Sequence, residues 1–267
     1  MNENRYERGL QKLQEIDGEA GERVLKSLED ISPDLGRFII EYSFGDIYAR
    51  EGLDLKSKEI AVVAALTAIG TARPQLNVHL NGALNVGCTI NEVKEVILQM
   101  AAYAGFPCCL NAMTALKEVL KDRQKHGIQD IPGTAPTNEA SHATRYETGA
   151  AELSQLDPCQ VERLQEAFHD ISPELVKFTL EFGYADIYAR NNLAKTYRQI
   201  ATIAALAALG NAQPQLKFHI NAGLNIGLTI ENIREIMLLM SVYAGFPAAI
   251  NGTNILKQVV QERQQSE

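Results

Sequence analysis

Three residues in the first half of the chain have side chains that together could transfer a proton and hold an anion: Glu59, Arg73 and His79. A carboxylate beside an imidazole orients the ring and raises its pKa, so the pair can serve as a general acid or base. A guanidinium can bind a carboxylate through two parallel hydrogen bonds. These three residues could therefore form a catalytic site for a small anionic organic substrate.

The same residues also have a purely structural interpretation. His79 could be a partly buried histidine that a single hydrogen bond satisfies, and Glu59 and Arg73 could be exposed charges near helix ends. Gly82 and Ala83, one helical turn after His79, leave space beside the imidazole but could equally serve close helix packing. The two interpretations differ in whether the three side chains carry chemistry.

The chain contains an internal duplication, which allows a comparison within one sequence. Residues 31–120 recur at 171–260 without insertion or deletion, so each residue of the first half, copy 1, has a counterpart 140 positions later in copy 2. His79 corresponds to His219. A repeat of this kind predicts two similar units joined in tandem.

The two copies differ at the residues that accompany the histidine. Glu59 is replaced by Gln199, and Arg73 by Gln213. Glutamine carries no charge, so it can neither raise the pKa of an imidazole by its charge nor form an ion pair with an anion. The copies are therefore expected to be functionally unequal, with the chemistry in copy 1.

Several motifs follow one another in a specific order. The segment Ala72–Gly87 is followed by Thr89 and then by Tyr103–Pro107. This arrangement resembles the carboxymuconolactone decarboxylase family, and the resemblance covers both copies and hence most of the chain. It implies an all-α, oligomeric protein whose fold is shared with the alkyl hydroperoxidase D proteins.

The resemblance also distinguishes two branches of this fold. In the alkyl hydroperoxidase D proteins, a Cys-x-x-Cys pair one turn before the histidine forms a thiol relay with an upstream glutamate. Here those positions are Ala72 and Gln75 in copy 1, and Ala212 and Gln215 in copy 2. The missing relay favours the decarboxylase branch.

The decarboxylase branch implies chemistry that needs no cofactor. Loss of carbon dioxide from a carboxylated γ-lactone leaves an electron pair in the unsaturated ring, and the resulting dienolate is protonated at carbon. His79 would deliver that proton, and Arg73 would hold a substrate carboxylate. The candidate substrate-binding side chains are Gln75, Asn81 and Tyr103, with Tyr48 and Asn85 as further candidate pocket walls.

Two adjacent cysteines offer a different chemistry. Cys108 and Cys109 follow Pro107 in the first turn of a predicted helix, where backbone amides lower the pKa of a thiol. Both are alanines in copy 2, and adjacent cysteines form strained disulfides, so packing of small side chains is the simpler interpretation. A thiol-dependent peroxidase or disulfide reductase using this pair is an alternative function, and a non-catalytic assembly or binding module is another.

Helices must position all of these residues, because apolar residues recur at helical spacing and alternating strand patterns are missing. Thr89 and Glu92 predict a capping box, and Ser32 predicts an N-cap before Pro33. The sequence predicts an all-α protein with helices in copy 1 at 3–16, 20–30, 33–50, 56–70, 73–86, 89–102 and 107–125. The Pro-containing, aperiodic segment 127–142 is the expected linker between domains 1–126 and 143–267.

The composition limits the partners and the location. A net charge of −8 disfavours nucleic acid and anionic membranes. The longest apolar runs, 60–69 and 200–209, are too short for a bilayer and no secretory signal begins the chain, so we expect a cytoplasmic protein. No cysteine or histidine spacing predicts a metal site or a disulfide framework. Ala-rich helices favour further burial between chains, and a trimer would bring six similar units together as a pseudo-hexamer.

Overall fold

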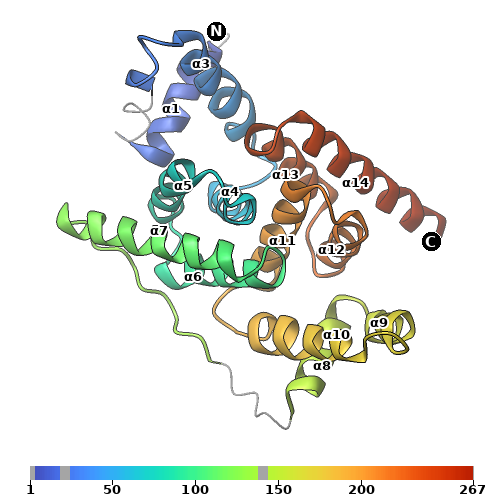
Figure 1. Cartoon of the computed structure of the whole chain (residues 1–267). Coiled ribbons are helices and arrows are strands. Elements are labelled where there is room, and N and C mark those ends of the chain that lie inside the picture. Colours follow the sequence, from blue (N-terminus) through green and yellow to red (C-terminus); the bar gives the residue numbers. More distant parts are fainter. Residues whose placement is uncertain (1–3, 19–24, 138–143, 267) are drawn as a thin grey trace.

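A computed structural model describes residues 4–18, 25–137 and 144–266. Within these ranges the chain is helical and has no β-strand, as the sequence predicts. The two copies pack side by side, with α4 (Leu55–Ile69) of copy 1 against α11 (Lys195–Leu209) of copy 2 near the centre (Figure 1). No helix in the described part is long and apolar enough to cross a membrane.

Corresponding elements follow in the same order in both copies. Copy 1 contains α1 (Arg5–Asp17), α3 (Pro33–Phe38), η1 (Ile39–Tyr48), α4, α5 (Arg73–Asn85), α6 (Ile90–Gln99), η2 (Met100–Ala102) and α7 (Phe106–Lys125). Copy 2 contains α8 (Arg145–Leu156), α9 (Gln160–Phe168), α10 (Pro173–Phe178), η4 (Thr179–Tyr188), α11, α12 (Gln213–Asn225), α13 (Ile230–Tyr243) and α14 (Phe246–Ser266). The tandem duplication is confirmed. Much of the predicted helix 20–30 lies outside the described residues.

The predicted helix 33–50 is not a single α-helix. After α3 the backbone widens into a π-helix, η1, and the N–H of Ala49 donates to the carbonyl of Phe44, five residues earlier, at 3.0 Å. The same change occurs at η4 in copy 2. π-Helical turns are rare and occur often at functional sites. Here the π-helix ends at Tyr48, whose side chain reaches α4.

The helix caps agree with the sequence in part. Thr89 and Glu92 form the predicted capping box, and Asn232 takes the place of the glutamate in an equivalent box in copy 2. Ser32 occupies the N-cap of α3, but its hydroxyl makes no capping hydrogen bond. Pro33, which follows it, has no N–H to be capped and its fixed φ already favours the start of a helix.

The N-terminal helix α1 crosses η1 at very short range. A Cβ atom added to Gly9 would lie 2.1 Å from the carbonyl oxygen of Ile40, and one added to Gly149 in copy 2 would lie 2.0 Å from that of Leu180. Glycine is required at both positions, because any side chain would push the two helices apart. This contact holds α1 against the element that carries Tyr48.

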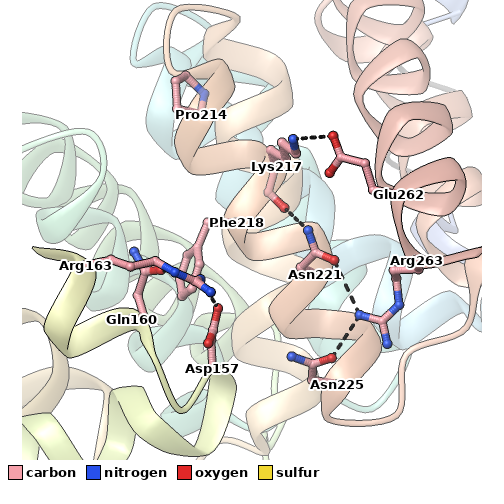
Figure 2. A pocket seen from close by; sticks show the side chains of 10 residues that line it. All are labelled: Asp157, Gln160, Arg163, Pro214, Lys217, Phe218, Asn221, Asn225, Glu262 and Arg263. Atoms are coloured by element: carbon pink, nitrogen blue, oxygen red, sulfur yellow. Dashed lines mark hydrogen bonds and ion pairs between the residues drawn. The ribbon is translucent and has the colours of Figure 1, made fainter. Parts of the chain in front are cut away.

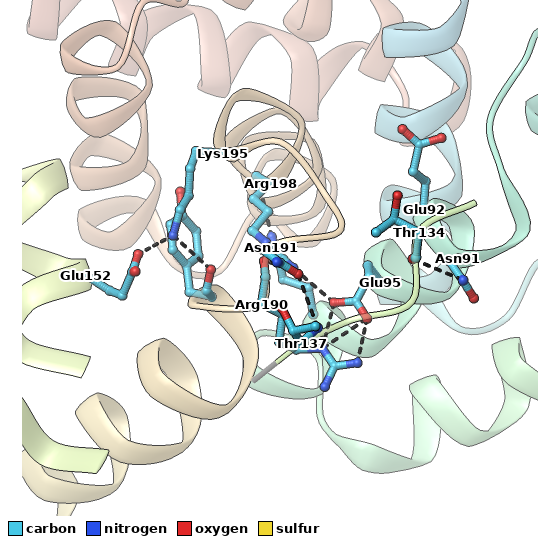
Figure 3. Close-up of polar contacts among 12 residues, drawn as sticks. Asn91, Glu92, Glu95, Thr134, Thr137, Glu152, Arg190, Asn191, Lys195 and Arg198 are labelled. Carbon is cyan, nitrogen blue, oxygen red and sulfur yellow. Dashed lines mark hydrogen bonds and ion pairs between the residues drawn. The ribbon is translucent and has the colours of Figure 1, made fainter. Parts of the chain in front are cut away.

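Reciprocal ion pairs join the two copies. Arg50 of copy 1 binds both carboxylate oxygens of Glu235 in copy 2 at 2.8–2.9 Å. Arg190 of copy 2 binds Glu95 of copy 1 at 2.8–3.0 Å, and the buried Arg198 adds a contact to the same carboxylate at 2.9 Å (Figure 3). Contacts exchanged in this way are those of two units related by a twofold rotation.

The described part of the predicted linker, residues 127–137, packs first on copy 1 and then reaches copy 2. The carbonyl of Ile131 accepts a hydrogen bond from the N–H of Ile90 at the start of α6, at 3.0 Å. The N–H of Thr137 donates to the side chain of Asn191 in copy 2 at 3.1 Å (Figure 3). The segment therefore passes along the boundary between the copies.

Candidate active site

The centre of the site in copy 1 is a buried carboxylate. Glu59 lies on α4, which is buried from Ser57 to Ala68, and the residue is 0% exposed. The helix is started by Asp54, whose side chain accepts from the N–H of Ser57 at 2.9 Å. A carboxylate in such a position is costly unless hydrogen bonds or a counter-charge compensate for the lost water. Glu59 has both.

A chain of hydrogen bonds surrounds Glu59. Nδ1 of His79, on α5, lies 2.9 Å from Oε2, and the hydroxyl of Tyr48 donates to Oε1 at 2.8 Å. The hydroxyl of Tyr243, from copy 2, donates to the Tyr48 oxygen at 3.0 Å, and its ring lies edge-on to the imidazole. No residue in the described part hydrogen-bonds Nε2 of His79.

The same environment sets the protonation of His79. Burial by itself lowers the pKa of the imidazole, because it penalises the charged form. The charge of Glu59 and the hydrogen bond to it, with a smaller contribution from the charge of Asp17, outweigh burial, so the pKa of His79 is raised above 6.5. Burial, together with the charge of Glu59, raises the pKa of Tyr48 well above its ordinary value, so this hydroxyl remains a neutral donor.

The corresponding site in copy 2 has the same layout without the charge. Nδ1 of His219 lies 3.0 Å from the amide oxygen of Gln199, whose nitrogen donates to the hydroxyl of Tyr188 at 2.8 Å. The hydroxyl of Tyr103 lies 3.2 Å from Nε2 of His219. Burial lowers the pKa of His219 to about 3. His219 is therefore a neutral imidazole at physiological pH, and both of its nitrogens are engaged.

Each site is completed by a tyrosine from the other copy. Tyr243 contacts His79, and Tyr103 contacts His219. The sequence predicts Tyr103 as a substrate-binding residue of the His79 site; the structure places it in the other site, and Tyr243 takes the position beside His79. Both tyrosines begin the repeated Tyr-Ala-Gly-Phe-Pro motif, which was visible in the sequence. The motif does not indicate which histidine each tyrosine faces, because that depends on how the copies dock.

Arg73 lies apart from the Glu59–His79 pair. Its guanidinium donates to Oδ1 of Asn77 at 3.3 Å, to the carbonyl of Asn111 at 3.2 Å and to Glu118 at 2.9 Å. Arg73 is the first residue of α5, so its acceptors come from the same helix and from α7. No hydrogen bond joins it to either member of the pair within the described part of the chain.

The amide side chains predicted as substrate contacts have other surroundings. Gln75 is exposed on the first turn of α5. Asn81 and Asn85 accept hydrogen bonds from Arg123 at 3.2 and 2.9 Å, and Arg123 also forms a bidentate ion pair with Asp130 at 2.7–3.1 Å. These contacts tie α5 to α7 and to the beginning of the linker.

A cavity of about 590 Å³ opens beside His219 and Tyr103 in copy 2. Its wall is largely aromatic and aliphatic, and it includes Gln215, the counterpart of Gln75. Several counterparts of its wall in copy 1 fall within residues 19–24, outside the described ranges. A pocket of this size and apolarity is typical of small-molecule sites, but the neutral His219 is poorly suited to deliver a proton.

A second cavity of about 670 Å³ adjoins the first and is polar (Figure 2). Arg263 on α14 donates to Asn221 and Asn225 on α12 at 3.3 and 2.9 Å, and Lys217 pairs with Glu262 at 2.7 Å. The Arg263 contacts mirror those of Arg123 in copy 1, and together with the Lys217–Glu262 pair they hold α12 against α14.

The cysteines are free thiols. Cys109 is buried and its thiol donates to the carbonyl of Ile97 at 2.9 Å; burial raises its pKa to about 11. Cys108 is partly exposed, and its Sγ lies 3.9 Å from the carbonyl oxygen of Ala68. No group of three or more potential metal ligands occurs in the ranges that the structure covers.

Comparison with known proteins identifies the same family in both copies. Residues 33–118 and 173–258 each match the carboxymuconolactone decarboxylase family. The chain is 36% identical over 121 residues to 4-carboxymuconolactone decarboxylase of Acinetobacter baylyi, covering 45% of this chain and 90% of that protein. It is 28% identical over 129 residues to nitrosuccinic acid decarboxylase of Metarhizium robertsii, covering 48% of this chain and 89% of that one.

A solved structure has the same fold over almost the whole chain. It is named as a gamma-carboxymuconolactone decarboxylase subunit of Burkholderia xenovorans, and it matches with a TM-score of 0.58 and 21% identity. The match covers 97% of this chain and 98% of that one, so it includes both copies. At this identity the likeness concerns the fold alone.

Proposed function

Because the chain belongs to the carboxymuconolactone decarboxylase family, we propose that its Glu59–His79 site decarboxylates a small organic acid. The observation that carries this proposal is the buried Glu59–His79 pair, in which Glu59 raises the pKa of the His79 imidazole. The corresponding histidine in copy 2, His219, has no carboxylate partner and a lowered pKa. A protonated histidine in a water-poor site is suited to protonate a carbanion equivalent.

Two relatives indicate the substrate class. They are named for decarboxylation of 4-carboxymuconolactone and of nitrosuccinic acid. In both compounds a carboxylate is attached close to an electron-withdrawing group, an unsaturated lactone or a nitro group. That group can accept the electron pair of the broken carbon–carbon bond. We therefore propose a carboxylated lactone, or another acid with such an acceptor, as the substrate of this chain.

The reaction can be written for this site without a cofactor, because the electron acceptor is part of the substrate. The bond between the substrate and its carboxylate breaks, carbon dioxide leaves, and the electron pair moves into the acceptor to give a dienolate or nitronate. Nε2–H of His79 can donate a hydrogen bond to the developing oxyanion, or it can transfer its proton to the substrate carbon. Glu59 holds the imidazole through Nδ1 and stabilises its charged form.

The proposal is tested by measuring carbon dioxide release. The purified full chain is incubated with 4-carboxymuconolactone, with nitrosuccinate, and with succinate as a control that has no strong electron acceptor. Release from one of the first two and not from succinate supports the proposal. Release from none of a wider panel of carboxylated lactones and nitro acids would overturn it.

Tyr243, which copy 2 contributes to the site around His79, should affect the activity of that site. Tyr243→Phe removes the hydrogen bond to Tyr48 but keeps the ring beside His79. We expect kcat to fall about 2- to 10-fold, the usual range for one neutral hydrogen bond. Tyr103→Phe is the matched control and should leave kcat unchanged. Steady-state kinetics of both variants check this, and an equal loss in both would contradict the assignment of the active site to copy 1.

The surface gives a prediction about assembly. Large apolar side chains are exposed at matching positions of the two copies: Ile31 and Ile171, Phe38 and Phe178, Phe106 and Phe246, and Leu110 and Ile250. Their exposure at both sets of positions favours symmetric contacts between chains. We expect a trimer, with three times the 29.4 kDa mass of the chain. Analytical ultracentrifugation checks this, and a monomer at micromolar concentration would contradict it.

A further inference from the structure

The cavity beside His219 has no role in the proposed decarboxylation, although it is large enough for a small molecule. Its volume is about 590 Å³, and its wall comes mainly from η4, α9 and the first half of α12. The rings that line it are those of Tyr103, Phe168, Phe178, Phe182, Tyr184 and Phe218. Aromatic walls of this kind pack well against a flat apolar molecule.

The cavity offers no free charge to a ligand. Arg163 is the one charged side chain in its wall within the described part of the chain, and its guanidinium pairs with Asp157 at 2.6 Å (Figure 2). His219 is neutral, because burial lowers its pKa to about 3. An anionic ligand would lose its water here without gaining a counter-charge.

The hydrogen bonds of His219 are also complete. The amide nitrogen of Gln199 donates to Tyr188, so the amide oxygen is the acceptor that faces Nδ1 of His219 at 3.0 Å. Nδ1 therefore carries the proton of the neutral ring, and Nε2 accepts from the hydroxyl of Tyr103 at 3.2 Å. The imidazole is a satisfied part of the wall and has no hydrogen bond left for a ligand.

Tyr184 differs from these groups, because its hydroxyl has no hydrogen-bond partner in the described part of the chain. The residue lines the cavity and is 8% exposed, yet its oxygen is not among the fully enclosed polar atoms, so a molecule in the cavity can reach it. Burial raises the pKa of Tyr184 well above its ordinary value, so the hydroxyl is a neutral donor. An unpartnered group in such a place indicates a ligand or a bound water.

The wall of this cavity also differs from the corresponding residues of copy 1. At three positions it lacks a hydroxyl that copy 1 carries: Phe182, Gly183 and Ala101 correspond to Tyr42, Ser43 and Ser241. Tyr184 and Thr179 show the reverse, since their counterparts are Phe44 and Ile39. The Thr179 hydroxyl donates to the carbonyl of Leu175 at 2.8 Å, so only the hydroxyl of Tyr184 is available. Copy 2 has thus exchanged several polar groups for an apolar wall with a single donor.

We propose that this cavity is a binding site for an uncharged aromatic molecule that carries one hydrogen-bond acceptor, such as the carbonyl of a ketone or lactone. The hydroxyl of Tyr184 donates to the carbonyl oxygen, and the rings of Phe182 and Phe218 pack against the apolar body of the ligand. The molecule is bound and not converted, because His219 has no acidic proton to transfer. This site is separate from the Glu59–His79 pair and does not depend on decarboxylation.

The test follows the histidine ring signals of the full chain by NMR during a titration with coumarin, an uncharged aromatic lactone. The His219 signal, assigned with the His219→Ala variant, reports on this cavity. We expect it to shift with a Kd below ~1 mM, as is usual for a ligand of this size. Coumarin-3-carboxylate has the same rings and a negative charge, and it should bind to this cavity at least ~10-fold more weakly.

Two outcomes with the wild-type chain would overturn the proposal. One is a His219 signal that does not move up to the solubility limit of coumarin, as expected if an apolar side chain of another chain fills the cavity. The other is equal affinity for coumarin and its carboxylate, because the cavity would then not select an uncharged molecule.

Two variants test the wall and the donor. Tyr184→Phe introduces the residue of copy 1 and removes only the hydroxyl, so we expect coumarin to bind ~3- to 10-fold more weakly. A Cβ atom added to Gly183 would meet no atom within 4 Å, so Gly183→Leu can extend into open space beside the wall without a clash. It should weaken binding by at least ~10-fold, and Gly183→Ala is the control that should change it less than ~2-fold. Unchanged affinity in both Tyr184→Phe and Gly183→Leu would refute the site, and the wild-type comparison of the two coumarins decides even if a variant misfolds.

Discussion

Replacing His79 with alanine is expected to lower the rate of decarboxylation by ~100-fold or more, whereas His219→Ala should change it little. A positioned general acid typically contributes ~10²–10⁴ to a rate. His79 is paired with a buried carboxylate, and Nε2 faces no hydrogen-bonding residue in the described part of the chain. His219 is a neutral imidazole that contacts Gln199 and Tyr103 on its two nitrogens. The measurement is kcat for both variants with the substrate that the wild type turns over.

His219→Ala is a well-matched control for His79→Ala, because both histidines are buried on equivalent helices. Any general cost of removing a buried ring should be similar in the two variants and can be compared through their melting temperatures. Equal losses of activity from both changes would show that the inequality between the copies has no catalytic meaning.

Glu59→Gln should also lower decarboxylation at pH 7 by ~100-fold or more, because it turns the copy 1 site into a copy of its counterpart. The carboxylate is the main group that raises the pKa of His79 against the effect of burial, and the charge of Asp17 adds a smaller contribution. Without the carboxylate the pKa of His79 should fall toward that of His219, which burial lowers to about 3. A smaller share of the imidazole is then protonated at pH 7, and only the protonated ring can donate a proton from Nε2 as an acid.

The pKa of His79 also determines how the rate of decarboxylation should change with pH. In the wild type the acid form of His79 is lost as the pH rises through its pKa, which lies above 6.5, so the rate should fall on the alkaline side. In Glu59→Gln that fall should move to lower pH. The reciprocal change Gln199→Glu should raise the pKa of His219, because it places a carboxylate beside Nδ1 of that ring. An unchanged pH profile in Glu59→Gln would mean that the carboxylate does not control the proton donor.

The sequence could predict the helices and the pairing of Glu59 with His79, though not its burial, because both depend on local or repeated patterns. Apolar periodicity indicated the helices, and the gap-free repeat indicated two equivalent units. Glu59 stood out because its counterpart is Gln199, and the structure places it 2.9 Å from His79. A charge that is present in one copy and absent from the other stands out, because corresponding elements follow in the same order in both copies.

Other features could not be read from one sequence because they depend on how elements pack. Arg73 is near His79 in sequence, but at the start of α5 its guanidinium meets Asn77 and Glu118. Tyr243 lies far from His79 in the chain and reaches it only because the copies dock reciprocally. The π-helix that ends at Tyr48 has no composition signal that separates it from an α-helix.

The most direct test of the central claim, that copy 1 holds the proton donor, is an NMR titration of the histidine side chains in the wild-type chain. Signals are assigned with the His79→Ala and His219→Ala variants. We predict that His79 titrates with a pKa above 6.5 and that His219 remains neutral down to about pH 4, consistent with its pKa of about 3. If the two histidines titrate together, or if His219 has the higher pKa, the account of an unequal pair of sites is contradicted.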